Sequence, residues 1–177
     1  MFRPAAVLSM IVVVSASIFA ADAPLDVQIK DVKKQSTLSL KKKIKRAEIG
    51  AALGQIYGVI GAYLGTKNIQ PLAAPFAVYK KSGADEFDVL AGFVVPDGTK
   101  GDGEIAAGEL HAGTTAFAVH VGPYDKLAET CDKIRAFAKS KGYTDLGENW
   151  EFYISDPGTT KPEELKTEIY VPIEKMK

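Results

Sequence analysis

Two periods of hydrophobic residues run along the chain, and each predicts a different kind of element. In residues 26–43 and 167–173, apolar residues alternate with polar ones, as in strands that bury one face. In residues 46–66, apolar residues recur every three or four positions, which predicts an amphipathic helix. A second helix is predicted after Gly122-Pro123, and Gly142 is placed to end it.

Further strands are predicted from runs of aromatic and β-branched residues, because these side chains favour extended backbone. The runs are residues 76–79, 87–95, 114–121 and 149–154. The resulting order is β-α-β-β followed by a second β-α-β-β, which predicts an α+β domain of two repeats. The repeats span about 26–96 and about 112–174 and are related by a pseudo-twofold. Each would hold an antiparallel sheet and one long helix, with a cleft between the repeats.

The first predicted helix has an unusual surface. Residues 49–66 carry no charge, and glycine recurs at positions 50, 54, 58, 61 and 65. This length and composition approach the lower limit of a membrane span, and such small residues also occur where membrane helices pair. So many glycines make a weak hydrophobic segment, however. We therefore predict a helix packed on a sheet, with the glycines allowing a sheet or another helix to approach closely.

A dense basic run, Lys41 to Arg46, precedes this helix. Such a run is typical of a solvated strand edge, where lysines discourage pairing with other chains, or of a helix start. A contact with a membrane surface or an acidic ligand is the alternative.

The N-terminus has the pattern of a secretory signal peptide. Met1-Phe2-Arg3 gives a positive start, residues 5–20 form an apolar run, and small residues follow near a cleavage point. Residues 1–21 are therefore predicted to be a signal peptide, with an uncleaved anchor as the alternative. Residues 22–177 would form a single exported domain, periplasmic or secreted, with no stable membrane span after cleavage.

Composition limits the chemistry. Lys plus Arg and Asp plus Glu both number 22, a balance that does not favour nucleic-acid binding. Cys131 is the one cysteine and lies on the apolar face of the second helix, so we expect a buried structural thiol. His111 and His120 are the two histidines and lack metal-ligand spacing, so we expect neither a metal nor a cofactor. We expect a neighbouring group to satisfy His120.

The strand that follows Asn149 carries an acid among aromatic residues. Alternation places Glu151 and Tyr153 on one face and Trp150, Phe152 and Ile154 on the other. An ionised carboxylate is costly to bury, so Glu151 either faces solvent or lines a pocket. Aromatic residues on this and other strands would be the walls of that pocket, or simply core. They are Tyr79, Phe93, Trp150, Tyr153 and Tyr170.

Three motifs occur in order along the chain. They are Gly122-Pro123-Tyr124-Asp125, Trp150-Glu151-x-Tyr153-x-x-Asp156-Pro157 and Thr167-Glu168-Ile169-Tyr170-x-Pro172-Ile173. From about residue 23 to the C-terminus the chain thereby resembles the GyrI-like small-molecule-binding family, also called the transcription-activator effector-binding domain. The resemblance implies an aromatic pocket between the repeats whose central acid, matched by Glu151, attracts cationic or amphipathic ligands. Tyr79 and Tyr170 match tyrosines of the family pattern.

These features lead to a hypothesis and three alternatives. We expect an exported domain that binds a small amphipathic ligand, cationic or aromatic, through Glu151 and the aromatic walls. The first alternative, implied by hydrolases in the same family, is hydrolysis of strained or electrophilic molecules, with Glu151 as acid or base beside Tyr153 or Tyr170. The others are haem binding through His120 and a purely structural domain. Regulatory relatives carry a helix-turn-helix domain that is not recognised here, so no transcriptional role is expected.

Overall fold

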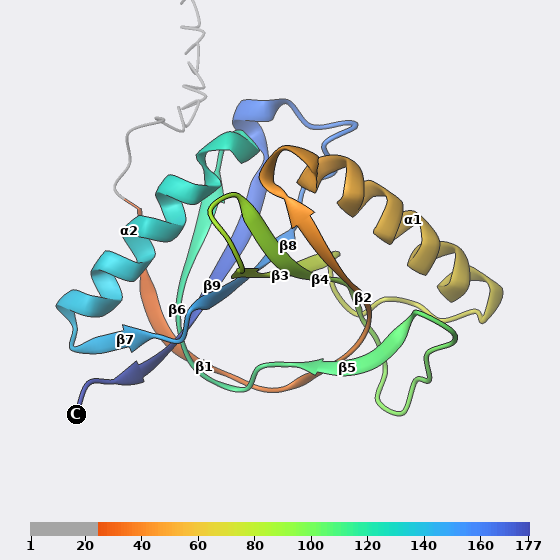
Figure 1. The fold of residues 1–177 in the computed structure, drawn as a ribbon, viewed down its shortest axis with the longest axis horizontal. Helices are drawn as coiled ribbons and strands as arrows, with labels where there is room; N and C mark the ends of the chain where they lie inside the picture. The colour runs from red at the N-terminus through yellow and green to blue at the C-terminus, as the bar shows by residue number, and fades with distance from the viewer. Residues whose placement is uncertain (1–24) are drawn as a thin grey trace, which may run out of the picture.

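A computed structural model describes residues 25–177 as a curled antiparallel sheet with two long helices (Figure 1). The predicted signal peptide, residues 1–21, lies outside the described residues. The strands are β1 (Gln28–Val32), β2 (Gln35–Lys45), β3 (Phe76–Lys81), β4 (Glu86–Val94), β5 (Ala106–Leu110), β6 (Gly113–Val121), β7 (Tyr143–Asp145), β8 (Glu148–Tyr153) and β9 (Lys166–Lys175). The long helices are α1 (Ile49–Thr66) and α2 (Leu127–Ser140), and the short 3-10 helices are η1 (Arg46–Glu48), η2 (Tyr124–Lys126) and η3 (Pro162–Glu164).

The strand order confirms the α+β fold of two repeats. It runs β1-β6-β9-β8-β3-β4-β2-β5, with β7 attached to β9. This order is symmetric about the β8–β3 pair, since β3-β4-β2 corresponds to β8-β9-β6. Helix α1 lies on the half formed by β3, β4 and β2, and α2 lies on the half formed by β8, β9 and β6. Both helices are on the outer face of the curled sheet (Figure 1). The two repeats therefore meet where β8 pairs with β3.

Each repeat starts with an extra strand that pairs with the other repeat. β1 pairs with β6, and β5 pairs with β2, so the two halves exchange their first strands. The sequence pattern of residues 26–43 allowed one long strand or two short ones, and the structure has two, β1 and β2. The pattern missed both β5 and β7. Ala106-Ala107-Gly108-Glu109-Leu110 has little intrinsic preference for extended backbone, so pairing with β2 determines this strand.

Helix α1 packs on its half of the sheet, as predicted. Its buried residues are Leu53, Ile56, Ile60 and Leu64, which contact the strands beneath. Among residues 25–177, the segment Arg46–Thr66 is the one helical stretch with the length and composition of a membrane span. Its apolar side is already covered by the sheet.

The predicted role of the α1 glycines is wrong. A Cβ atom added at Gly50, Gly54, Gly58, Gly61 or Gly65 would meet nothing within 4 Å. Because the residues that touch the sheet are the large aliphatic ones, the glycines fall on the opposite, solvent-facing side.

The basic run lies on a solvated strand edge. β5 covers β2 only as far as Ser39, so beyond that point β2 pairs with β4 alone. Lys41, Lys42, Lys43 and Lys45 are exposed along this free edge. Lysines at such a position oppose edge-to-edge association, which matches the prediction from sequence.

Candidate functional site at Glu151

Glu151 lies in the middle of the sheet, at the junction of the two repeats. On β8 it is flanked by Ala77 of β3 and Ile169 of β9. Its side chain points to the face that carries the helices and is 5% exposed. The first interpretation from sequence, a solvated carboxylate, is therefore wrong. Burial on this scale requires hydrogen-bond partners.

Partners come from the same strand and from the facing repeat. The Tyr153 hydroxyl donates to Glu151 Oε2 at 2.8 Å, and Asn149 Nδ2 donates to Glu151 Oε1 at 3.3 Å. The hydroxyls of Tyr79 and Tyr153 lie 2.6 Å apart, so Tyr79 donates to Tyr153 when Tyr153 donates to Glu151. Because side chains alternate along a strand, residues 149, 151 and 153 share one face.

The nearest cation reaches Glu151 only through Asn149. Arg135 of α2 donates from Nη2 to Asn149 Oδ1 at 3.1 Å and from Nε to Asp145 Oδ2 at 3.2 Å. Among the described residues, the ion pairs of Arg135 are with Asp145 and Asp132 and none involves Glu151. The carboxylate thus has hydrogen-bond donors but no direct counter-ion within residues 25–177.

Burial dominates the electrostatics of this cluster. It raises the pKa of Glu151 to about 7, although the hydrogen bonds from Tyr153 and Asn149 act to lower it. Burial also raises the pKa of Tyr79 and Tyr153, so both hydroxyls stay protonated and available as donors. Glu151 can therefore change its charge close to neutral pH, as acid–base and ion-binding groups do.

Aromatic rings surround the carboxylate on this face. The ring centroid of Tyr153 lies 5.6 Å from that of Tyr124 and 6.4 Å from that of Tyr57. Tyr57, on α1, also contacts Phe93 edge-on at 5.7 Å, and its hydroxyl donates to the Phe76 carbonyl at 3.0 Å. We call Tyr57, Tyr79, Phe93, Tyr124 and Tyr153, with Glu151, the tyrosine cluster.

Two members of the tyrosine cluster were not among the predicted site residues. Tyr57 was hidden within the apolar stripe of its helix, although it follows Leu53 by four positions and so shares the sheet-facing side. Tyr124 was recognised within the Gly122-Pro123-Tyr124 motif but was not assigned to the site. It is 36% exposed and forms the outermost part of the cluster.

The six predicted site residues do not line one pocket, which corrects the prediction. Glu151, Tyr79, Tyr153 and Phe93 lie on the helix-bearing face. Trp150 and Tyr170 lie on the opposite face, where their rings stack at 5.3 Å between centroids and an interplanar angle of 6°. The reason is register: Trp150 faces Tyr170 across the β8–β9 pair, and both neighbours of Glu151 in the chain must point away from it.

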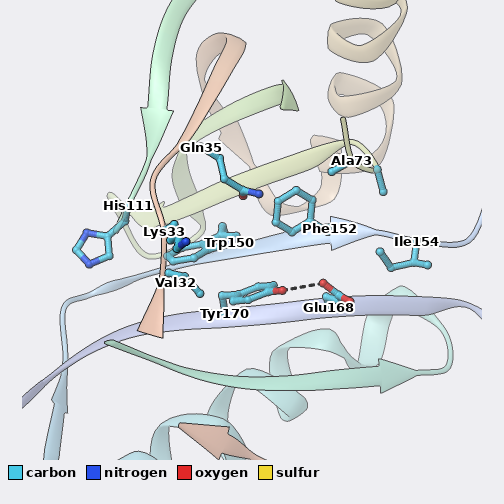
Figure 2. Close-up of a pocket in the computed structure, with 11 residues that line it drawn as sticks. Val32, Lys33, Gln35, Ala73, His111, Trp150, Phe152, Ile154, Glu168 and Tyr170 are labelled. Atoms are coloured by element: carbon cyan, nitrogen blue, oxygen red, sulfur yellow. Dashed lines mark hydrogen bonds between the residues drawn. The ribbon is translucent and has the colours of Figure 1, made fainter. Parts of the chain in front are cut away.

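A pocket of about 450 Å³ lies on this opposite face (Figure 2). Its aromatic residues come from β8 and β9, and the β1–β2 and β5–β6 connections close its sides. The lining residues are Val32, Lys33, Gln35, Ala73, Ala74, His111, Trp150, Phe152, Ile154, Glu168 and Tyr170.

The histidine and cysteine of the second repeat have structural surroundings. His120 is buried, with Nδ1 2.8 Å from Thr130 Oγ1 and Nε2 3.3 Å from the Pro123 carbonyl. A neighbour thus satisfies it, as predicted, and neither ring nitrogen is left for a haem iron. Cys131 is a buried free thiol, also as predicted. Residues 25–177 contain no group of three or more side chains suited to hold a metal ion.

The curled antiparallel sheet of exchanged repeats, with one long helix on each half, defines an α+β fold class built from two repeats. A family model described as the GyrI-like small molecule binding domain matches residues 25–174. The chain belongs to this family, and the resemblance drawn from its motifs is confirmed. No curated protein sequence matches the chain.

Solved structures with this fold include regulators and hydrolases. The C-terminal domain of EcmrR has a TM-score of 0.76 and 22% identity, covering 86% of this chain and 99% of that one. In the EcmrR–DNA complex the TM-score is 0.74 at 23% identity, and the match covers 86% of this chain but only 58% of EcmrR. A hydrolase from Listeria innocua gives 0.64 at 15% identity, covering 86% and 94%. SAV2435 bound to tetraphenylphosphonium gives 0.62 at 13%, covering 84% and 94%. These likenesses show the fold.

Proposed function

We propose that the protein binds an amphipathic organic cation at the tyrosine cluster, with Glu151 as the counter-ion. The observation that supports this proposal is a carboxylate that is 5% exposed and accepts hydrogen bonds from two neutral donors. Aromatic rings surround it, and it has no ion-pair partner among residues 25–177. Aromatic faces and a desolvated carboxylate both attract a lipophilic cation, since each gains electrostatic energy where water is excluded.

Entry of a ligand requires side chains to move. Tyr79 and Glu151 are buried, whereas Tyr124 is 36% exposed and Tyr57 lies at the edge of the sheet-facing side of α1. Tyr124 is the first residue of the short η2 helix, directly after Gly122-Pro123, so its ring can turn outward without disturbing a strand. We expect displacement of Tyr124 to open the path to Glu151.

The direct test is titration with tetraphenylphosphonium, which is the ligand of a solved protein with this fold. We expect saturable binding by calorimetry, weakened at least about tenfold in Glu151→Gln, because the buried charge pair is lost. Affinity should also rise between pH 6 and pH 8, since Glu151, whose pKa is about 7, ionises over this range.

The matched control is Glu148→Gln. This residue lies on the same strand, but its side chain points to the opposite face and is half-buried, so the substitution removes the same charge elsewhere. Equal binding by wild-type protein, Glu151→Gln and Glu148→Gln would refute the role of Glu151. Absence of any binding to a panel of lipophilic cations would refute the proposal.

The hydrolase alternative stays a prediction. Its support is the near-neutral pKa of Glu151 beside a protonated tyrosine, which suits general acid–base chemistry. We expect any turnover of a strained electrophilic substrate, followed by mass spectrometry of the product, to disappear in Glu151→Gln and persist in Glu148→Gln. Turnover that both variants retain would place the chemistry elsewhere.

A further inference from the structure

The pocket on the face opposite the helices is built differently from the tyrosine cluster. Its floor holds the stacked Trp150 and Tyr170 rings, and Phe152 meets Tyr170 edge-on at 5.9 Å and 78° (Figure 2). Its volume of about 450 Å³ falls within the range of small-molecule sites. Because the sheet lies between them, a ligand here does not touch Glu151.

The acid in this pocket is already compensated. Glu168 Oε2 accepts a hydrogen bond from the Tyr170 hydroxyl at 2.8 Å (Figure 2). Lys30 lies close by, with Nζ 4.7 Å from the Tyr170 ring centroid and 3.2 Å from that of Phe117. The protein's own ammonium group therefore occupies the place where a cation would meet these ring faces, in the field of Glu168.

The lysine in this pocket has no such compensation. Lys33 is exposed and takes part in none of the ion pairs found within residues 25–177. Its neighbour Lys34 behaves differently, since its Nζ pairs with Glu109 Oε1 at 2.8 Å. The side-chain charge at the pocket that lacks a partner among residues 25–177 is thus positive, and it lies beside the aromatic residues of the floor.

We propose that this pocket is a second binding site, which takes a small aromatic carboxylate. The ring of the ligand packs on Tyr170, Trp150 and Phe152, and its carboxylate pairs with Lys33. The site differs from the tyrosine cluster in both the face of the sheet and the charge of the ligand, so it does not depend on the function proposed above.

Trp150 makes the site directly observable, because it is the one tryptophan of the chain. We expect biphenyl-4-acetate to change the fluorescence of Trp150 saturably, with a matching calorimetric titration. In Lys33→Gln the affinity should fall about fivefold, the effect of one solvent-exposed ion pair. In the matched variant Lys34→Gln it should change less than about twofold. The neutral amide of the same probe should bind more weakly and be indifferent to Lys33→Gln.

Three outcomes would overturn the proposal. They are no saturable change with biphenyl-4-acetate, an equal loss in Lys33→Gln and Lys34→Gln, and loss of the signal in Glu151→Gln. An equal loss would indicate a diffuse charge effect, and the last outcome would place the probe at the tyrosine cluster. Tetraphenylphosphonium binding is read separately through Glu151→Gln, so failure of either proposal leaves the other testable.

Discussion

Replacing Glu151 by glutamine is expected to stabilise the protein by up to about 3 kcal/mol at pH 8 and to change little at pH 4. Burial raises the pKa of this carboxyl from 4.5 to about 7, so the folded protein holds the proton more tightly than the unfolded chain does. The stability that this proton confers is fully present below about pH 4.5 and is lost as the pH rises through about 7. At about 1.4 kcal/mol per pH unit, this difference gives the stated size.

Glutamine suits this position because it keeps the shape and the hydrogen bonds without the charge. Tyr153 and Asn149 can turn their donors and acceptors to match an amide. Urea denaturation at pH 4, 6 and 8 measures the effect, with Glu148→Gln as the control that should show no such trend. An equal gain at all three pH values, or none at pH 8, would mean that Glu151 is not the buried acid described here.

A gain of this kind would also bear on function. A domain of this size has a net stability of only about 5–15 kcal/mol, so a destabilising ionised group is a large fraction of it. Groups that weaken a fold in this way are typical of binding and catalytic sites, where the same desolvation strengthens contact with a ligand. The stability measurement and the cation titration therefore test the same physical cause, the desolvation of the Glu151 carboxylate, by two independent readouts.

The face of the sheet to which each side chain of β8 points could be predicted from sequence, because side chains alternate along any strand whatever the tertiary structure. Glu151 and Tyr153 indeed share one face, and Trp150 and Phe152 share the other. The error was to assign aromatic residues from both faces of the sheet to one pocket, on residue type and on the family resemblance. Placing Tyr170 opposite Trp150 requires the register of β8 with β9, which no local pattern in the chain encodes.

The exchange of first strands between the repeats could not be predicted from local sequence patterns, for a related reason. β5 consists of small and polar residues apart from Leu110, and its pairing with β2 joins segments some 70 residues apart. The contacts that determine this strand are therefore non-local. The α1 glycines are a case in which a local pattern was available but was interpreted wrongly. Their spacing was read as a close contact, but the spacing of the large aliphatic residues was the stronger guide to the buried side.

Replacing Gly92 by alanine is expected to destabilise the protein by more than about 3 kcal/mol. Gly92 is buried in β4 between β2 and β3, opposite Ser39 and Phe76. A Cβ atom there would overlap the carbonyl oxygen of Leu38 and lie 2.8 Å from the Ser39 Cα. Both are backbone atoms of a paired strand, so relief requires β2 and β4 to separate. Thermal unfolding should show a melting temperature lower by about 10 °C.

Gly58→Ala is the matched control, because the same added methyl group meets nothing within 4 Å on the solvent side of α1. It should raise stability by about 0.5–1 kcal/mol, since alanine restricts the unfolded chain and favours the helix. A Gly92→Ala variant that melts like wild type would show that the β2–β4 contact is looser than described. Phe93 follows Gly92 directly and meets Tyr57 at 5.7 Å, so separation of these strands would also withdraw one wall of the tyrosine cluster. The site at Glu151 thus depends on backbone contact between β2 and β4, neither of which pairs with the strand of Glu151.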